Sequence, residues 1–445
     1  MIDYTLPLDE LPDPLPIEPL AKPFDVTITP PGSKSITNRA YVLAALADGE
    51  SRIIRPLRSD DCDNLLEALC TLGAEARWED EDVFIRGVNG RFPRGGSVNL
   101  GDGGAPTRFM IACACLAAEP VIVDGSPRMR QRPIAEGIDM LRQLGAHIEY
   151  VEEEGRLPVR VVPSDDFKGG ELTIGKTASS QFISAVMLVA PWNKVDLELR
   201  ISDEITSLPY VYLTRKVLSD WGVVVRIQLN EEHMLDLEAI TVEAVRLASQ
   251  QYGIESDASG ATYWFAAAAI SPGSAVTLAG LPASSAQHDL NLPTVLEKAG
   301  AWIRTHEQHV DMRLSYRRPL SAFDEDMACM PDAALTLGAV AAVAETPSRI
   351  TGLHTLRVKE TDRVAALANE LRRIGCTVET TDDSITIDPS TRHEEPVIIE
   401  TYNDHRMAMA FGVLGLARPG ISIANPKCVK KSYPGFWRDF AKLYQ

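Results

Sequence analysis

A glycine that ends a helix-like segment recurs at nearly constant spacing along this chain of 445 residues. The five segments read LCTLGAEARW, LRQLGAHIEY, LSDWGVVVRI, LEKAGAWIRT and LRRIGCTVET, and their glycines are Gly73, Gly145, Gly222, Gly300 and Gly375, about 75 residues apart. Glycine readily adopts the left-handed conformation that ends many helices, so each segment predicts a helix, a tight turn and a strand. Five such segments at one spacing indicate a repeated unit. Continuing the count places a sixth helix at the C-terminal FWRDFAKL.

A second segment repeats with the same period, and it consists of a short polar stretch followed by an alanine-rich apolar helix. The six cases are GSKSITNRAYVLAALA, GGAPTRFMIACACLAA, ASSQFISAVMLVA, ASGATYWFAAAAI, PDAALTLGAVAAVA and YNDHRMAMAFGVLGLA. The polar stretches hold Gly, Ser, Asp or Asn, which are natural residues for starting a helix. The helix bodies are apolar nearly all round, so we expect them to be buried. Strand-like runs lie between the two helices of each repeat, namely SRIIRPL, PVIVDG, VDLELRI, AVTLAG, SRITGL and ISIANP.

The two repeats together predict an α/β fold of two domains, each made of three βαβαββ units. Buried parallel helices surrounded by sheets, an inside-out α/β barrel, would send their N-termini toward one cleft between the domains. Helix N-termini offer unpaired N–H groups and the positive end of a dipole, so such a cleft favours phosphate and carboxylate ligands. We expect the active site there. The predicted domains are residues 1–31 together with 254–445, and residues 32–253.

Composition excludes several classes of protein. A net charge of −18 argues against a nucleic-acid surface, which needs a basic stripe. No stretch approaches the roughly 18 apolar residues that a membrane-spanning helix requires. The seven cysteines form no CxxC pair and no Cys/His cluster at metal-ligand spacing, so we expect no metal site and a reducing cytoplasm. The acidic, proline-rich residues 1–31 predict an extended arm rather than a folded unit or a targeting peptide.

The polar stretches that open the first three helices allow more than one interpretation. Residues 31–39 pack two cations and several hydroxyls around a helix start, but the P-loop spacing GxxxxGK[ST] is absent. Residues 101–108 resemble half a dinucleotide fingerprint, and we reject that reading because Pro106 replaces the third glycine. Ser179, Ser180 and Gln181 suit phosphate oxygens and hydroxyls, although simple helix capping explains them equally well.

Charged strings mark the rest of the candidate site. Residues 127–133 carry three arginines between two prolines, and arginine forks suit bidentate binding of carboxylate or phosphate. The string RVKETDR, residues 357–363, holds five charges, and Asp332, the sequence NDHR and a lysine group at 427–431 follow the same repeat logic. His405 in NDHR is more often structural than catalytic in such a context. The residues alone therefore predict an enzyme with an anion-binding cleft.

Eight strings in this order resemble the 5-enolpyruvylshikimate-3-phosphate synthase family from Pro31 to about Phe436. They are GSKSITNR, PRMRQRPI, SSQF, SDAS, PDAA, RVKETDR, YNDHRMAM and PKCVKKSYP. The resemblance implies a monomeric, cofactor-free transferase of the shikimate pathway, which leads to chorismate and the aromatic amino acids. Its reaction would move the enolpyruvyl group of phosphoenolpyruvate to the 5-hydroxyl of shikimate 3-phosphate. The reaction would proceed by addition to give a tetrahedral intermediate, followed by elimination of phosphate.

The resemblance also implies roles for individual residues. Contacts to the substrates at the first helix opening would come from Lys34, Ser35 and Arg39. Shikimate 3-phosphate would be held by Ser179, Ser180, Gln181, Ser207 and Tyr210. Phosphoenolpyruvate would be surrounded by Gly104, Arg128, Gln181, Arg363, Arg406 and Lys431.

The implied catalytic residues are Asp332, Glu360 and Lys34. Asp332 and Lys359 would face the shikimate hydroxyls, with Asp332 acting as the base toward the 5-hydroxyl. Glu360, together with Lys34, would transfer protons at the methylene carbon of phosphoenolpyruvate. The division of these roles between addition and elimination stays open at this point.

The chain departs from the family pattern in two places. Where the family usually has Asn-Ala-Gly-Thr-Ala-Met-Arg-Pro, residues 102–109 read DGGAPTRF, which keeps Gly104 and Arg108 but changes their neighbours. Thr355 stands where the family commonly has asparagine, and its hydroxyl could replace part of the lost amide contact to shikimate phosphate. PRMRQRPI resembles the branch of the family that is sensitive to the inhibitor glyphosate, whereas the altered residues 102–109 point the other way, so glyphosate sensitivity stays open.

Two other functions compete with this interpretation. The sister enzyme that acts on UDP-N-acetylglucosamine shares the fold but uses a glycine-rich loop with a reactive cysteine, and no such loop occurs here. A catalytically inactive anion-binding relative should first lose its carboxylates and arginines. This chain keeps Asp332, Glu360, Arg128, Arg363 and Arg406.

Overall fold

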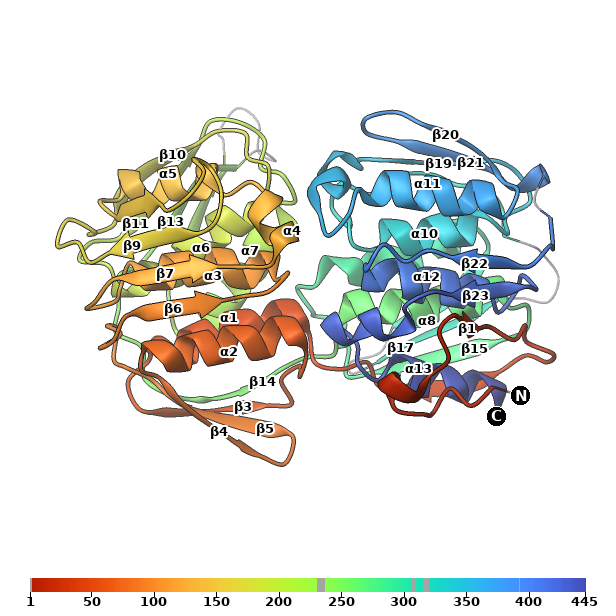
Figure 1. Cartoon of the computed structure of the whole chain (residues 1–445), viewed down its shortest axis with the longest axis horizontal. Helices are drawn as coiled ribbons and strands as arrows, with labels where there is room; N and C mark the ends of the chain where they lie inside the picture. Colours follow the sequence, from red (N-terminus) through yellow and green to blue (C-terminus); the bar gives the residue numbers. More distant parts are fainter. Residues whose placement is uncertain (1, 230–236, 306–308, 315–319, 392) are drawn as a thin grey trace. The chain divides into compact units, whose positions relative to one another are not determined.

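The structure is a computed structural model that describes residues 2–229, 237–305, 309–314, 320–391 and 393–445. It divides the chain into two compact units, which are residues 34–254 and residues 1–33 together with 255–445. Figure 1 labels the helices and strands of both units. Both are mixed α/β, and both are built from the βαβαββ repeat that the sequence predicts.

The unit 34–254 holds three repeats. The first contains α1 (Lys34–Leu46), β3 (Glu50–Ile54), α2 (Asp60–Leu72), β4 (Glu75–Glu79) and β5 (Asp82–Arg86). The second contains β6 (Gly96–Asn99), α3 (Gly104–Ala114), β7 (Val121–Asp124), α4 (Pro127–Gln131), α5 (Ala135–Gln143), β8 (His147–Tyr150) and β9 (Val159–Val162). The third contains β10 (Gly170–Ile174), α6 (Ser180–Val189), β11 (Leu197–Ile201), α7 (Pro209–Asp220), β12 (Val225–Leu229) and β13 (Leu237–Val242).

Each repeat of this unit forms one four-stranded sheet in the described part of the chain. The strand orders are β14-β3-β5-β4, β6-β7-β9-β8 and β10-β11-β13-β12. The first pair of each sheet is parallel and the others are antiparallel. The first repeat borrows its opening strand, β14 (Gln251–Gly253), from the end of the unit. The chain thereby closes the unit on itself.

The unit 1–33 with 255–445 repeats the same plan. Its first repeat contains α8 (Ala258–Ile270), β15 (Ala275–Ala279), α9 (Leu292–Lys298), β16 (Ala301–Thr305) and β17 (His309–Leu314). The second contains β18 (Asp324–Asp326), α10 (Ala334–Ala341), β19 (Ser348–Thr351), α11 (Arg363–Arg373), β20 (Thr377–Thr380) and β21 (Ile385–Asp388). The third contains β22 (Val397–Ile399), α12 (His405–Leu414), β23 (Ile421–Ile423) and α13 (Phe436–Ala441).

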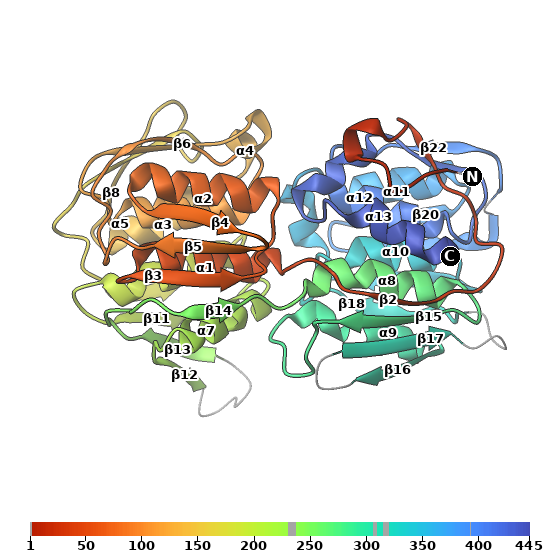
Figure 2. The same cartoon turned by 90° about the horizontal axis from the view of Figure 1, so that it is seen from below.

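The N-terminal segment completes two sheets of this unit. Strand β2 (Asp25–Ile28) pairs parallel with β15, as Figure 2 shows. Strand β1 (Leu15–Pro16) pairs antiparallel with β23, giving the three-stranded order β1-β23-β22. The last repeat ends at α13, so β1 takes the place of its missing final strands.

The local predictions from the repeat are confirmed. All five repeat glycines have φ between +86 and +126, the range that favours glycine. The N–H of Gly73 donates to the carbonyl of Cys70 (3.0 Å) and thereby ends α2. The six strand-like runs coincide with β3, β7, β11, β15, β19 and β23. The predicted C-terminal helix is α13.

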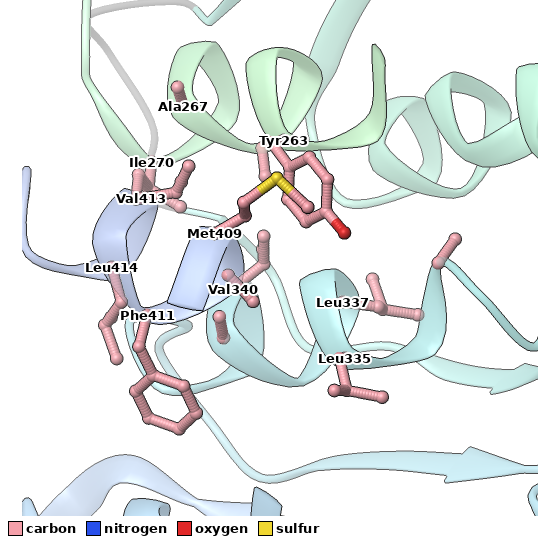
Figure 3. Packing of buried hydrophobic residues seen from close by; sticks show 14 of the residues in the cluster. Tyr263, Ala267, Ile270, Leu335, Leu337, Val340, Met409, Phe411, Val413 and Leu414 are labelled. Atoms are coloured by element: carbon pink, nitrogen blue, oxygen red, sulfur yellow. The ribbon is translucent and has the colours of Figure 1, made fainter. Parts of the chain in front are cut away.

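The apolar helices form the centre of each unit, as their composition predicts. In α10 and α12 every residue is buried, and Figure 3 shows buried side chains of α8, α10 and α12, among them Ile270, Val340 and Met409, in one hydrophobic cluster. Fully burying one such side chain contributes about 1.5–3 kcal/mol. The run Ala266–Ala269 in α8 keeps that helix slim enough for close packing. Among the described residues, no helix is both long and apolar enough to cross a membrane.

The acidic N-terminal arm contains the 3₁₀ helix η1 (Leu8–Glu10) as well as β1 and β2, and it belongs to the hydrophobic core of its unit. Tyr4, Leu11, Leu15 and Ile17 are all buried. The Tyr4 ring lies 5.3 Å from that of Phe440 and 5.5 Å from that of Tyr444. These contacts bring the two ends of the chain together beside α13, as Figure 1 shows.

Candidate active site

Arg363, the first residue of α11, is the centre of a buried group of charges in the unit 1–33 with 255–445. Its side chain is 2% exposed. Its Nε donates to Asp404 Oδ2 at 2.7 Å, one terminal nitrogen to Asp332 Oδ1 at 3.0 Å, and the other to Glu360 Oε2 at 2.9 Å. One guanidinium thus joins three carboxylates that lie up to 72 residues apart in the sequence.

Two further cations complete this group. Arg406, in the first turn of α12, donates to Asp332 Oδ2 at 2.7 Å. Lys431, at the end of the 3₁₀ helix η6 (Pro426–Lys431), donates to Glu360 Oε1 at 2.9 Å. We call Asp332, Glu360, Arg363, Asp404, Arg406 and Lys431 the arginine–carboxylate cluster. Five of its six members were predicted site residues, and the structure brings these five together.

The cluster is strongly coupled electrostatically. Burial alone would lower the pKa of Arg363, but the charges of Asp404, Glu360 and Asp332 outweigh it and raise that pKa. Arg406 also donates to the hydroxyl of Tyr263, shown in Figure 3, and burial raises the pKa of Tyr263 to about 12. Buried charges are costly unless they are paired. The cations can exchange a protein carboxylate for the carboxylate or phosphate of a ligand without being left unpaired.

A further buried carboxyl group lies on this side of the unit. Asp289 is 4% exposed and accepts a hydrogen bond from the hydroxyl of Ser259, in the first turn of α8. Burial raises the pKa of Asp289 to about 7, and the charge of Asp332 adds to the shift. Asp289 lies in the 3₁₀ helix η3 (His288–Asn291), and it was not predicted because no repeat or motif of the sequence marks this aspartate.

Two further predicted residues of this unit, Thr355 and Lys359, lie in or directly after a 3₁₀ helix. Thr355 lies in the 3₁₀ helix η4 (His354–Val358), is 6% exposed, and its hydroxyl has no hydrogen-bond partner in the described part of the chain. Lys359 follows η4 directly and is half-buried. His405 is fully buried with Nδ1 at 3.5 Å from Asp404 Oδ1, a placement in keeping with a structural role.

The unit 34–254 carries its own polar residues at the starts of its buried helices. Lys34 is the first residue of α1, and its Nζ lies 3.2 Å from Asp61 Oδ2 in α2. The two side chains are 18% and 6% exposed. Asp61 was not among the predicted site residues. The sequence signal for Asp61 is the SDD string at residues 59–61, where the outer helix of the first repeat begins. The repeat marked that helix only as a structural element.

Arg39 lies deeper than the resemblance implied. It is 3% exposed, and its donors reach Thr214 Oγ1 (2.8 Å), the Ser35 carbonyl (2.8 Å), Ser184 Oγ (3.2 Å) and the Tyr210 carbonyl (3.2 Å). Burial lowers the pKa of this guanidinium to about 10. Arg39 therefore ties α1 to α6 and α7, and its described contacts are with the protein's own oxygens.

The start of α3 is packed against an arginine. Gly104 is the first residue of α3, and a Cβ atom added there would stand 2.7 Å from both terminal nitrogens of Arg132. Arg132 is 6% exposed, and its Nε has no hydrogen-bond partner among the described residues. Arg108, one turn into α3, donates to the carbonyls of Gly104 and Pro133, both at 2.9 Å.

The three arginines of PRMRQRP thus have different environments. Arg128 lies in α4, is only partly buried and donates to Gln131 Oε1 at 3.2 Å. Arg130 pairs with Asp124 and Glu152. Arg132 is the buried one beside Gly104. The resemblance pointed to Arg128, whereas Arg132 is the arginine of this segment that lies buried against the start of α3.

The starts of α6 and α7 hold the predicted hydroxyl groups. Ser179 caps α6 by accepting from the N–H of Gln181 at 3.3 Å, and Ser180 is buried. The side-chain oxygen of Gln181 is buried and without a hydrogen-bond partner in the described residues. Ser207 is left-handed (φ 54), and its carbonyl accepts from the N–H of Tyr210 in α7.

The helix starts of each unit therefore present arginine, lysine, carboxylate and hydroxyl groups in a largely buried setting. Among the described residues, no group of three or more His, Cys, Asp or Glu side chains could hold a metal ion. These features define an α/β enzyme that acts on small anions.

Comparison with known proteins then identifies the family. The profile of EPSP synthase (3-phosphoshikimate 1-carboxyvinyltransferase) matches residues 20–440. The chain is 37% identical to the 3-phosphoshikimate 1-carboxyvinyltransferase of Erwinia tasmaniensis, over 97% of this chain and 99% of that protein. It is 38% identical to that of Haemophilus ducreyi, over 96% and 98%. The chain belongs to the EPSP synthase family and is a transferase.

A solved structure agrees with the predicted fold. EPSP synthase from Acinetobacter baumannii superposes with a TM-score of 0.78 at 24% identity, covering 96% of this chain and 97% of that one. At this identity the likeness shows the fold alone. It confirms the predicted fold class of two α/β domains built from βαβαββ repeats.

Proposed function

We propose that this chain transfers the enolpyruvyl group of phosphoenolpyruvate to the 5-hydroxyl of shikimate 3-phosphate and releases phosphate. The observation that carries the proposal is the arginine–carboxylate cluster in a chain that matches the family over residues 20–440. Both substrates are anions, so the cluster has the charge that they require.

The reaction is an addition followed by an elimination. A proton joins the methylene carbon of phosphoenolpyruvate, and the 5-hydroxyl oxygen bonds to the adjacent carbon as the hydroxyl proton leaves. The tetrahedral intermediate then loses a proton from the new methyl group while its carbon–oxygen bond to phosphate breaks. The products are the enolpyruvyl ether and inorganic phosphate, and no oxidant or reductant is needed.

In this proposal, Arg363, Arg406 and Lys431 bind the carboxylate and phosphate of phosphoenolpyruvate. Their present partners, Asp332 and Glu360, lose these cations when the substrate binds. A carboxylate that loses a neighbouring positive charge holds its proton more tightly. Substrate binding thus prepares Asp332 to accept the 5-hydroxyl proton and Glu360 to exchange a proton with the methylene carbon.

The unit 34–254 supplies the other assigned groups. Lys34 takes part in proton transfer and exchanges Asp61 for a substrate oxygen. Gly104 and Arg128 bind phosphoenolpyruvate, together with Arg132. Shikimate 3-phosphate is held by the helix-start residues Ser179, Ser180, Gln181, Ser207 and Tyr210. Arg39 acts by fixing Ser35 and Tyr210, since its donors end on protein oxygens.

Thr355 and Lys359 complete the shikimate contacts in this assignment. The Thr355 hydroxyl has no described partner, so it is available to replace the amide that the family commonly has there. Transfer to UDP-N-acetylglucosamine is not favoured, because the matched relatives carry the shikimate name. The proposal further includes that the enzyme is a monomer and that it acts in the cytoplasm.

The test is phosphate release by the purified chain. We expect release only when phosphoenolpyruvate and shikimate 3-phosphate are both present, and none with UDP-N-acetylglucosamine as the acceptor. Asp332→Asn serves as the control for contaminating enzyme. Parallel reactions with glyphosate measure whether the enzyme is inhibited, and thereby whether residues 102–109 alter the phosphoenolpyruvate site. Phosphate release with UDP-N-acetylglucosamine as the acceptor but not with shikimate 3-phosphate would overturn the proposal. Tight binding of both substrates without any phosphate release would overturn it as well.

A further inference from the structure

The chain makes a strained turn between β22 and α12. Tyr402 and Asn403 both have left-handed backbones, with φ of 54 and 55. For residues other than glycine this conformation costs about 1–2 kcal/mol each, so two in succession need support from outside the turn. The next residue is Asp404, which caps α12 through the N–H of Arg406 (2.9 Å) and pairs with Arg363 (2.7 Å).

One support comes from α11. Glu370 is 1% exposed, and its Oε1 accepts from the Tyr402 hydroxyl at 2.9 Å. Its Oε2 accepts from the N–H of Glu400 at 3.1 Å and from Arg373 at 2.7 Å. Glu370 comes seven residues after Arg363, which places both on one face of the helix about 10 Å apart. Helix α11 therefore holds the segment 400–404 at two points.

A second support comes from the segment that follows β23. The side-chain oxygen of Asn403 accepts from the side-chain nitrogen of Asn425 at 3.1 Å. Asn425 is itself left-handed (φ 47), and its N–H donates to Asp13 of the N-terminal arm at 2.9 Å. The 3₁₀ helix that ends in Lys431 starts directly after Asn425. Both supports thus converge on the segments that carry Asp404, Arg406 and Lys431.

We propose that Glu370 and Tyr402 are positioning residues for anion binding: their hydrogen bond keeps the left-handed turn in the form that lets Asp404 cap α12 and hold Arg363. The inference rests on the proposed function, because phosphoenolpyruvate is taken as the anion that Arg363 and Arg406 bind. Neither Glu370 nor Tyr402 touches the cluster by a described hydrogen bond. Their effect passes through the backbone of residues 402–404.

The experiment compares Tyr402→Phe with Tyr4→Phe in the full chain. Each variant removes one tyrosine hydroxyl that is hydrogen-bonded within the same unit, and Tyr4 donates to the Pro16 carbonyl at 3.1 Å, far from the cluster in the sequence. We expect the KM for phosphoenolpyruvate and its Kd from calorimetry to rise roughly tenfold in Tyr402→Phe, as for other small misplacements of binding groups. Neither should change in Tyr4→Phe, although both variants lose some thermal stability.

Two further variants test the route. In an Asp404→Asn background, Tyr402→Phe should add little to the loss of phosphoenolpyruvate affinity, because the group it positions has already changed. Glycine adopts φ near +54 without strain, so Tyr402→Gly, which removes the same hydroxyl and leaves the Asn403–Asn425 hydrogen bond in place, should lower the affinity less than Tyr402→Phe does. Equal Kd values for wild type and Tyr402→Phe, or full additivity with Asp404→Asn, would overturn the inference. Absence of turnover in the wild type would refute the proposed function. The comparison of Kd values would still decide whether Glu370 and Tyr402 position the anion-binding groups.

Discussion

The terminal nitrogens of Arg132 lie 2.7 Å from the position that a Cβ atom on Gly104 would occupy, so a buried guanidinium fills the space beside the start of α3. Only glycine leaves room for Arg132 in its present place. This contact links the helix start to the arginine-rich segment that the resemblance assigned to phosphoenolpyruvate. It also leads to the first of four predictions.

Gly104→Ala should displace Arg132 and weaken phosphoenolpyruvate binding. The added methyl group overlaps the guanidinium, which must move because contacts this short are not sustained. We expect the KM for phosphoenolpyruvate to rise by about tenfold or more, with a smaller effect on shikimate 3-phosphate. Gly253→Ala is the matched control, since a Cβ there meets nothing within 4 Å. Equal KM values for the two variants would show that Arg132 has no part in binding.

Glu360→Gln should reduce turnover much more than binding. The amide keeps the size of the side chain but cannot exchange a proton as the carboxyl group does, and such exchange contributes about 10²–10⁴-fold to rate. We expect kcat to fall at least a hundredfold while the Kd of phosphoenolpyruvate changes only severalfold. Steady-state kinetics with calorimetry measure both, and Glu379→Gln on the exposed face of β20 is the control. A kcat near that of the wild type would remove Glu360 from the catalytic assignment.

Asp289 should make the protein less stable as the pH rises. Its pKa is raised from 3.8 to about 7 by burial, so between these values the folded state binds more protons than the unfolded state. The stability that this proton provides is complete below about pH 4 and is lost as the pH rises through 7. Asp289→Asn removes the ionisable group. The free energy of unfolding of this variant should therefore increase relative to that of the wild type as the pH rises from 5 to 8. Urea denaturation of both proteins at the two pH values tests this, and a constant difference would contradict it.

Leu15→Ala should destabilise the unit 1–33 with 255–445. Leu15 is fully buried in the N-terminal arm, and removing such a side chain costs about 2–5 kcal/mol. Leu6→Ala, in the same arm, should cost less than about 0.5 kcal/mol, because Leu6 is 36% exposed. Chemical denaturation measures both values. Similar small losses in the two variants would mean that the arm detaches readily from the core in solution.

The repeated architecture could be predicted because its signals are local. A helix that ends in glycine, an apolar helix body and a β-branched strand are each encoded within about 15 residues, and the period between them revealed the unit. The family strings likewise named most residues of the arginine–carboxylate cluster, and two of these, Asp332 and Arg406, lie at the starts of apolar helices that the repeat already marked. The prediction for residues 1–31 was an extended arm, but the segment contains the 3₁₀ helix η1 and is packed into the core. Proline limits the local backbone, but burial depends on contacts with residues about 400 positions away in the sequence, such as those of Tyr4 with Phe440 and Tyr444.

What the sequence by itself determined is therefore the set of elements, their repetition and the kind of chemistry gathered at the helix starts. The tertiary structure decided which charged groups face each other. It buried Arg132 rather than Arg128, turned Arg39 inward onto Ser35 and Tyr210, and placed Asp61 against Lys34. It also set the left-handed turn at Tyr402 that a glutamate on another helix supports. The physical reason is that burial and charge pairing depend on distances between residues far apart in the chain, and only the packed fold sets those distances.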